Sequence, residues 1–128
     1  MENQKHQYTA LYERTNHVSG GVSEPNGILA QKKLLTEYVK FHDFSDIKHY
    51  SDEGISGNKF DRPALNELLN DVRNGNIDTV VVKNLSRIGR NIVEVIRLVK
   101  DLENYGVRLI SISDEIDTFA QMQKGGSL

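Results

Sequence analysis

The chain has 128 residues, of which 38% are hydrophobic and 27% are charged, and its formal net charge is -2. This length suits one globular domain with its own core, and the charge excludes a domain that is basic throughout. The absence of cysteine excludes disulfide scaffolds and cysteine-ligated metal sites. The polar first residues and the lack of any long apolar run lead us to expect a cytoplasmic protein without membrane contact.

The first part of the chain alternates between extended and helical patterns. A short, mostly apolar run over residues 8–12 predicts a strand, and the glycine- and serine-rich residues 15–27 predict a loop. Over residues 28–42, apolar side chains recur at helical spacing while lysine and glutamate fill the opposite side, which predicts an amphipathic helix. Residues 47–50 form a second, shorter strand candidate, and a loop with glycines and acidic residues follows over residues 51–61.

A second helix and a buried strand come next. Pro63 suits the first helical position because the fixed φ of proline is helical, and Gly75 suits the left-handed residue that ends this helix. Residues 79–82 are β-branched throughout, which is typical of a strand buried on both faces of a sheet. We therefore expect this strand in the interior of the sheet, beside residues 8–12.

The last third of the chain predicts one more helix and one more strand. A polar, basic loop over residues 84–91 leads into an amphipathic helix over residues 92–105, which Gly106 ends. Residues 107–112 form the fourth strand candidate, before an acidic stretch over residues 114–117. Strands separated by helices pair in parallel through right-handed crossovers. The order predicts an α/β fold, with an open, mainly parallel sheet of about four strands and helices on both faces.

Four arginines lie beside the predicted carboxyl ends of strands, where sheets of this kind place their sites. They are Arg14, Arg62, Arg87 and Arg90. Residues 83–97 hold four basic side chains and one acidic one, a local charge of +3 in an acidic chain. Guanidinium groups bind phosphate oxygens and stabilise the charge that develops during phosphoryl transfer. We therefore expect the four arginines to converge on one anion-binding pocket; the alternative is four separate, solvated surface residues.

Several motifs, taken in order, resemble the catalytic domain of the serine recombinases, the resolvase/invertase family. They are Arg14 after a first strand, Asp-Glu-Gly-Ile-Ser-Gly at 52–57, Asp-Arg-Pro at 61–63, Ser-Arg-Ile-Gly-Arg-Asn at 86–91, and residues 114–118. They look like those of the large serine recombinases of mobile elements, and the resemblance covers about residues 8–122. It implies a resolvase-like catalytic domain that takes part in DNA recombination or DNA integration by a transposon or similar element.

The resemblance also implies a covalent mechanism that needs neither a cofactor nor a metal. In this family a serine hydroxyl attacks a DNA phosphodiester and forms a phosphoserine link, the 3′ hydroxyl leaves, and arginines supply the positive charge. Residue by residue, the arginines that match the family's catalytic, phosphate-binding ones are Arg14, Arg62, Arg87 and Arg90. Gln31 matches a glutamine that supports the same site.

The resemblance fails at the nucleophile. The family reads Tyr-x-Arg-x-Ser, whereas residues 12–16 read Tyr-Glu-Arg-Thr-Asn, so Asn16 occupies the nucleophile position. An amide has no ionisable hydroxyl and cannot form the phosphate ester, so we expect an inactivated relative or a chain altered at this residue. Thr15 should point away from the position of Asn16 because side chains alternate along a strand. Ser19 could replace the serine only if its loop folded back.

The chain also ends before the long dimerising helix and the DNA-binding region that the resemblance implies. We therefore expect residues 1–128 to be a single catalytic domain, either a fragment or a shortened protein. Alone it should bind DNA weakly, because neutralisation of phosphates supplies most non-specific affinity and the net charge is -2. For the full-length protein the resemblance implies a homo-oligomer, a dimer or a tetramer.

Two other functions stay open on the sequence. The same fold could serve as a non-catalytic module that binds a phosphate group or pairs with an active recombinase. Asp114 and Asp117, at a predicted strand end, could instead hold Mg²⁺ in a metal-dependent phosphoryl-transfer enzyme. Metal dependence separates this enzyme from the other two functions, and covalent capture of cleaved DNA separates a recombinase from a binding module.

Overall fold

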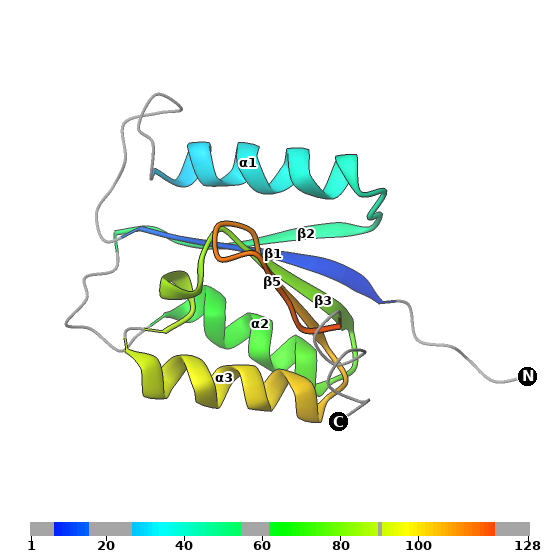
Figure 1. The fold of residues 1–128 in the computed structure, drawn as a ribbon, viewed down its shortest axis with the longest axis vertical. Coiled ribbons are helices and arrows are strands. Elements are labelled where there is room, and N and C mark those ends of the chain that lie inside the picture. Colours follow the sequence, from blue (N-terminus) through cyan, green and yellow to red (C-terminus); the bar gives the residue numbers. More distant parts are fainter. Residues whose placement is uncertain (1–6, 16–26, 55–61, 90, 120–128) are drawn as a thin grey trace, which may run out of the picture.

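The computed structural model describes residues 7–15, 27–54, 62–89 and 91–119, and in these ranges strands and helices alternate (Figure 1). The strands are β1 (Tyr8–Arg14), β2 (Ile47–Asp52), β3 (Ile77–Val82), β4 (Arg108–Ser111) and β5 (Ile116–Asp117). The helices are α1 (Ile28–Phe41), α2 (Pro63–Arg73) and α3 (Ile92–Asn104), and a short 3-10 helix, η1 (Leu85–Arg87), follows β3. Each predicted strand and helix is present.

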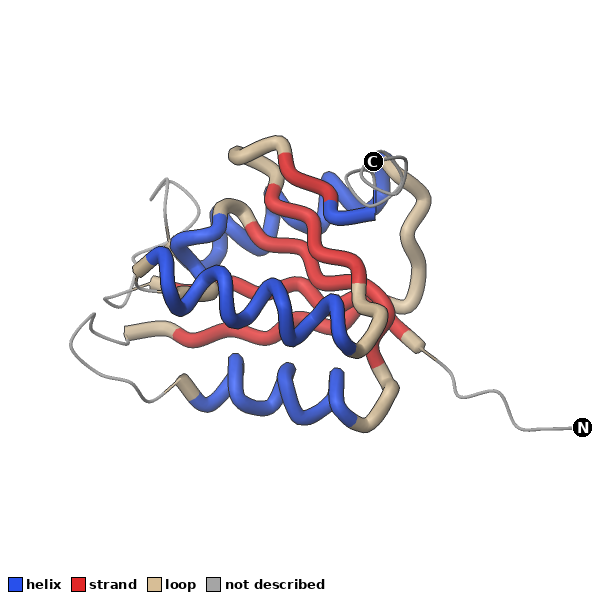
Figure 2. Tube along the Cα trace, turned by 60° about the horizontal axis from the view of Figure 1, so that its bottom comes forward, coloured by secondary structure: helices blue, strands red, loops and turns tan. Residues whose placement is uncertain are grey.

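All five strands belong to one sheet with the order β2-β1-β3-β4-β5, which Figure 2 shows from a second direction. β1 pairs in parallel with both β2 and β3, and β3 pairs in parallel with β4. The predicted interior position of residues 79–82 beside residues 8–12 is therefore confirmed, since Thr9 pairs with Thr79 and Tyr12 with Val82. The α/β class and the mainly parallel sheet are confirmed with it.

The helices cover both faces of this sheet, α1 on one side and α2 with α3 on the other (Figure 1). Alternation along the strands divides the core accordingly. On the α1 side, Leu11, Val81 and Ile110 pack with Leu35 and Val39. The core of the other side is larger, and its most buried members are Ala10, Tyr12, Tyr50, Leu68, Ile77, Val80, Val82 and Leu109. Full burial of one such aliphatic side chain contributes about 1.5–3 kcal/mol.

The helix ends follow the predicted signals. Pro63 is the first residue of α2, and Gly75 follows its last turn with a φ of 79°. Gly106 follows α3 with a φ of 73°. Both glycines adopt the left-handed conformation that glycine reaches without the steric cost of a Cβ atom. Within the described ranges, no helix combines the length and the apolar character that crossing a membrane requires.

Two features of the sheet differ from the sequence prediction. β5 was not predicted: it has two residues and pairs antiparallel with β4, so the acidic stretch 114–117 is not only a loop. A two-residue strand is too short to show an alternating pattern. In addition, β1 and β2 each run two residues past their predicted ends, onto Arg14 and Asp52. These charged residues are buried because each finds polar partners, which hydrophobic periodicity does not reveal.

Candidate active site

Arg14, the last residue of β1, is the centre of the candidate site. Its side chain is buried and donates two hydrogen bonds to η1, from Nη2 to the Ser86 carbonyl at 2.9 Å and from Nε to the Arg87 carbonyl at 3.2 Å. Its backbone pairs with the Gln31 side chain of α1: Arg14 N–H donates to Oε1 at 3.2 Å, and Gln31 Nε2 donates to the Arg14 carbonyl at 3.0 Å. Strand, helix and η1 thus all fix this one residue.

The η1 helix brings two more arginines to the same place. Arg87, its last residue, donates from Nη1 to the Arg14 carbonyl at 3.2 Å. The carbonyl of Ile88, the next residue, accepts a long hydrogen bond of 3.5 Å from Arg62 Nη1. Burial and the neighbouring charge of Arg62 lower the pKa of Arg14, and burial lowers the pKa of Arg87. Because guanidinium groups stay protonated in proteins, the cluster is a partly desolvated concentration of positive charge that favours a bound anion.

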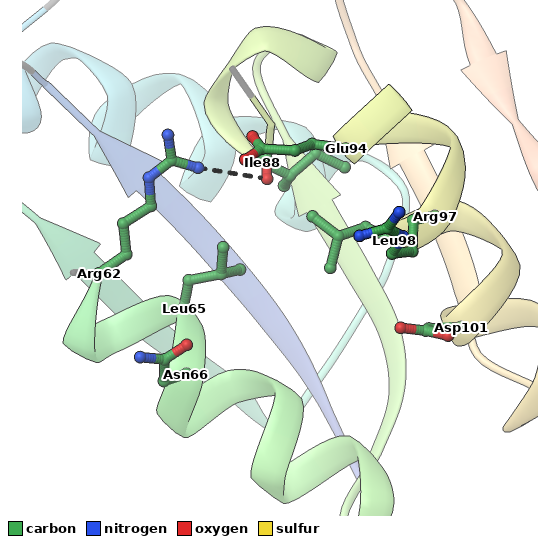
Figure 3. A pocket seen from close by; sticks show the side chains of 8 residues that line it. All are labelled: Arg62, Leu65, Asn66, Ile88, Glu94, Arg97, Leu98 and Asp101. Atoms are coloured by element: carbon green, nitrogen blue, oxygen red, sulfur yellow. Dashed lines mark hydrogen bonds between the residues drawn. The ribbon is translucent and has the colours of Figure 1, made fainter. Parts of the chain in front are cut away.

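Arg62 is the member of the cluster whose donors are least used. It lies directly before α2, its exposed fraction is 6%, and its Nε and Nη2 atoms are buried with no hydrogen-bond partner in the described part of the chain. A buried donor left without a partner costs about 1–3 kcal/mol. Figure 3 shows its guanidinium at one end of a cavity of about 180 Å³ between α2 and α3, reaching toward the Ile88 carbonyl.

Asp52, at the end of β2, holds the start of α2, the helix that Arg62 directly precedes. Its carboxylate is buried and accepts hydrogen bonds from the backbone N–H groups of Ala64 at 2.9 Å and Leu65 at 3.1 Å. It also accepts from the Tyr12 hydroxyl at 2.7 Å. Burial, followed by the hydrogen bond to Asp52, raises the pKa of the Tyr12 phenol, which therefore stays a neutral donor. Asp52 of β2 thus caps the amino end of α2.

Four of the six predicted site residues lie in the described part of the chain: Arg14, Gln31, Arg62 and Arg87. The three arginines meet around η1, and Gln31 contacts the backbone of Arg14. Asn16 and Arg90 lie outside the described residues, as does Ser19. Thr15, the other hydroxyl near the nucleophile position, is buried with an exposed fraction of 3%, and its backbone N–H donates to the Asp52 carbonyl at 3.0 Å. Anion binding by the cluster stays a prediction.

The two carboxylates of the metal-dependent alternative accept hydrogen bonds from different protein donors. Asp114 Oδ2 accepts from the Ser111 hydroxyl at 2.6 Å and from the Leu85 N–H at 2.9 Å. Asp117 forms a bidentate ion pair with Arg108, with hydrogen bonds of 3.0 and 2.7 Å. Across the ranges that the structure describes, no three histidine, aspartate or glutamate side chains gather in a metal-binding arrangement.

Sequence reasoning missed Glu13, which lies between Tyr12 and Arg14 but points to the α1 side of the sheet. It is fully buried, and its carboxylate accepts from the Ser51 hydroxyl at 2.6 Å and lies 2.6 Å from His49 Nδ1. No clear signal for it was present in the sequence, because the predicted strand ended at residue 12; only the longer β1 shows that a buried charge at residue 13 needs polar partners on the neighbouring strand.

Comparison with known proteins places this arrangement in a family. The family model described as "Resolvase, N terminal domain" matches residues 3–125. The crystal structure of the N-terminal catalytic domain of TP901-1 integrase superposes with a TM-score of 0.78 at 33% identity, over 88% of this chain and 82% of that one. A resolvase family site-specific recombinase from Streptococcus pneumoniae superposes with a TM-score of 0.71 at 26% identity, over 94% and 89%.

Curated relatives agree with the structural ones. The transposon Tn552 DNA-invertase BinR of Staphylococcus aureus is 44% identical over 85 residues, which are 66% of this chain and 43% of that protein. The transposon Tn917 resolvase of Enterococcus faecalis is 41% identical over 70 residues, which are 55% of this chain and 37% of that protein. The matches thus span about two fifths of these relatives. Because the family model covers nearly the whole sequence, the chain belongs to the resolvase family of serine recombinases, as a member of its N-terminal domain.

Proposed function

We propose that this chain is the catalytic domain of a site-specific DNA recombinase and that its arginine cluster binds the phosphate at which strands are exchanged. The observation that carries the proposal is the arrangement of Arg14, Arg62 and Arg87 around η1, each delivered by a different strand-end segment. Relatives named resolvase, DNA-invertase and integrase support DNA as the partner. As in the family, the full-length protein acts as a homo-oligomer, a dimer or a tetramer.

The chemistry of the cluster fits a phosphodiester better than a carboxylate. Phosphate offers several oxygens in different directions, and guanidinium groups bind it through charge-assisted hydrogen bonds. The buried Nε and Nη2 atoms of Arg62 supply donors that no described protein acceptor uses. Positive charge held in a desolvated site also stabilises the negative charge that grows on a phosphoryl group under attack.

We also infer that the chain lacks the hydroxyl nucleophile of its active relatives. In an active relative, the serine oxygen would attack phosphorus, lose its proton and displace the 3′ oxygen of the DNA strand. Asn16 occupies that position and offers no hydroxyl. The neighbouring Thr15 is buried, which supports its exclusion as a substitute. We therefore expect the unmodified chain to bind phosphate but neither to cleave DNA nor to form a covalent adduct, even when joined to a DNA-binding region.

The test is a suicide DNA substrate that carries the recombination site of the element encoding this chain, with protein-linked DNA measured on a denaturing gel. With each chain joined to a DNA-binding region for that site, we expect no adduct from the unmodified sequence and a covalent adduct from Asn16→Ser. An adduct with the unmodified chain, mapped to Ser19 or Thr15, would refute the deficiency. If Asn16→Ser forms no adduct while phosphate binding persists, the chain is instead a non-catalytic phosphate-binding module of the same fold.

A further inference from the structure

The turn after β4 contacts the amino end of η1 through one carboxylate. Asp114 Oδ2 accepts the Leu85 N–H at 2.9 Å, and Leu85 is the first residue of η1. The residue directly before η1, Asn84, makes no side-chain cap of its own, and its Oδ1 instead accepts the Ser86 hydroxyl at 2.6 Å. The capping position of η1 is thus filled by a residue of the turn after β4.

The carboxylate of Asp114 is itself held in place. The buried Ser111 hydroxyl donates to the same Oδ2 atom at 2.6 Å. The backbones on either side are joined beyond the ends of β3 and β4, since Ile112 N–H donates to the Val82 carbonyl at 3.0 Å and Ser113 N–H to the Lys83 carbonyl at 2.8 Å. Next to these two backbone hydrogen bonds, the hydrogen bond from Leu85 N–H to Asp114 links the turn after β4 to η1.

The other end of η1 meets the arginines. The carbonyls of Ser86 and Arg87 each accept a hydrogen bond from the Arg14 side chain, and the Ile88 carbonyl accepts one from Arg62. We propose that Asp114 is a positioning residue of the arginine cluster: by capping η1 it fixes the three carbonyls that orient Arg14 and Arg62. This inference deepens the proposed function and rests on it for the effect on phosphate.

Charge alone makes the opposite prediction, which gives the inference a sharp test. A carboxylate near a phosphate site repels the phosphate, so its removal should strengthen binding if charge decides the outcome. If orientation decides it, removal should weaken binding, because the guanidinium groups lose their fixed acceptors. The neighbouring Glu115 is exposed, so neutralising it changes the charge by the same amount without touching η1.

The experiment compares three variants of the full chain, Asp114→Ala, Asp114→Asn and Glu115→Gln, with inorganic phosphate as the probe. We expect Asp114→Ala to weaken phosphate binding about 3- to 10-fold and to speed amide exchange at Leu85 about 10-fold or more, as loss of a charge-assisted hydrogen bond implies. Asp114→Asn keeps an oxygen acceptor and should recover most of both losses. Glu115→Gln should leave exchange unchanged and binding equal or tighter.

A second readout does not depend on phosphate. The NMR signal of the Arg14 Nε–H group reports its hydrogen bond to η1, and we expect Asp114→Ala to shift it while Glu115→Gln does not. If that signal stays in place, or if Asp114→Ala binds phosphate as well as or better than the unmodified chain, the inference is overturned. If the unmodified chain binds no phosphate while the Arg14 signal still responds to Asp114→Ala, the positioning role stands and the proposed function fails. Should Asp114→Ala not fold, Ser111→Ala removes the second hydrogen bond to the same carboxylate, and the same outcomes apply.

Discussion

Each face of the sheet buries one carboxylate at the ends of β1 and β2, but the groups that contact the two carboxylates differ. On the α2 face, Asp52 accepts hydrogen bonds from the backbone of α2 and from Tyr12. On the α1 face, Glu13 is contacted by two side chains of the neighbouring strand, His49 and Ser51. Both carboxylates are buried, and the first caps the helix that Arg62 precedes, whose buried Nε and Nη2 atoms have no acceptor among the described residues.

The difference follows from the alternating directions of successive side chains along β1. Tyr12 and Arg14 point to the α2 face and Glu13 to the α1 face, because successive side chains of a strand point to opposite sides. Parallel pairing then places Ser51 beside Glu13 and Asp52 beside Arg14. A buried charge is tolerated only with partners. On the α1 face the Glu13 carboxylate is contacted by His49 and Ser51. On the α2 face the buried Nε and Nη2 atoms of Arg62 have no acceptor among the described residues, and we predict that an anion supplies it.

The largest expected effect comes from Arg14 on the α2 face. In the Asn16→Ser background, Arg14→Lys should lower the yield of covalent DNA adduct about 100-fold or more, because one ammonium group cannot hold the Ser86 and Arg87 carbonyls and also stabilise a phosphoryl group. The measurement is protein-linked DNA on a denaturing gel. Arg73→Lys, at the exposed end of α2, is the matched control and should retain full yield.

Asp52→Ala should cause the largest loss of stability, about 3–5 kcal/mol in the free energy of unfolding. The change leaves the first N–H groups of α2 and the Tyr12 hydroxyl without their acceptor inside the core. Urea unfolding followed by circular dichroism measures it, with the exposed neighbour Glu53→Ala as control. A loss below about 1 kcal/mol would show that the start of α2 does not depend on this carboxylate.

Glu13→Gln tests whether the α1 face is independent of the ligand site. We expect a loss of about 1–3 kcal/mol in the free energy of unfolding, since Ser51 and His49 contact different carboxylate oxygens and the amide keeps only one of them. Phosphate binding, measured by titration calorimetry, should change by less than about twofold, because the donors of Arg62 lie on the other face. An equal fall in phosphate affinity for Glu13→Gln and Asp52→Asn would mean that the faces are coupled.

The smallest effect is expected from Asp71, on the α2 side but at the far end of α2. Burial alone would raise the pKa of Asp71, but the hydroxyls of Tyr50 and Tyr8 and the ammonium of Lys48 outweigh it and lower that pKa. A carboxyl with a lowered pKa in the folded state contributes stability above its ordinary pKa of about 4 and loses it as the pH falls further. Asp71→Asn should therefore cost about 0.5–1.5 kcal/mol at pH 7 and almost nothing near pH 2.

Urea unfolding at several pH values measures this difference between Asp71→Asn and the unmodified chain. A loss of stability that stays constant from pH 7 to pH 2 would contradict the role of its ionised form. Phosphate binding at pH 7 should not respond to this substitution.

Local patterns in the sequence predicted most of the fold and part of the site. Proline, glycine and helical periodicity placed α2 and α3, and the β-branched run placed β3, because each of these signals acts within a few residues. The arginines could be grouped because parallel strands end at one edge of a sheet. The structure places Arg14, Arg62 and Arg87 around η1, and the catalytic and phosphate-binding roles of all six predicted site residues stay predictions.

The contacts that hold the arginines could not be predicted in the same way. Asp52 caps a helix that begins eleven residues later, and Asp114 caps η1, which begins twenty-nine residues before it. Neither cap lies at the usual distance from its helix, so no capping motif marks it. From the sequence, Asp52 could therefore be placed only in a family motif, and Asp114 only in such a motif or a possible metal site, because composition near a strand end cannot show which backbone N–H group a carboxylate will meet.

The pairing of Gln31 with the backbone of Arg14 has a consequence for how this protein can vary. The side-chain amide of Gln31 pairs with Arg14 as the backbone of a neighbouring strand would: it accepts from the Arg14 N–H and donates to the Arg14 carbonyl. The start of α1 is therefore fastened to the end of β1, whatever chain joins them. Closing a longer connection costs only about 0.6 kcal/mol for each doubling of its length. Lengthening the connection between Asn16 and Gly27 should accordingly cost little stability and leave Arg14 in place.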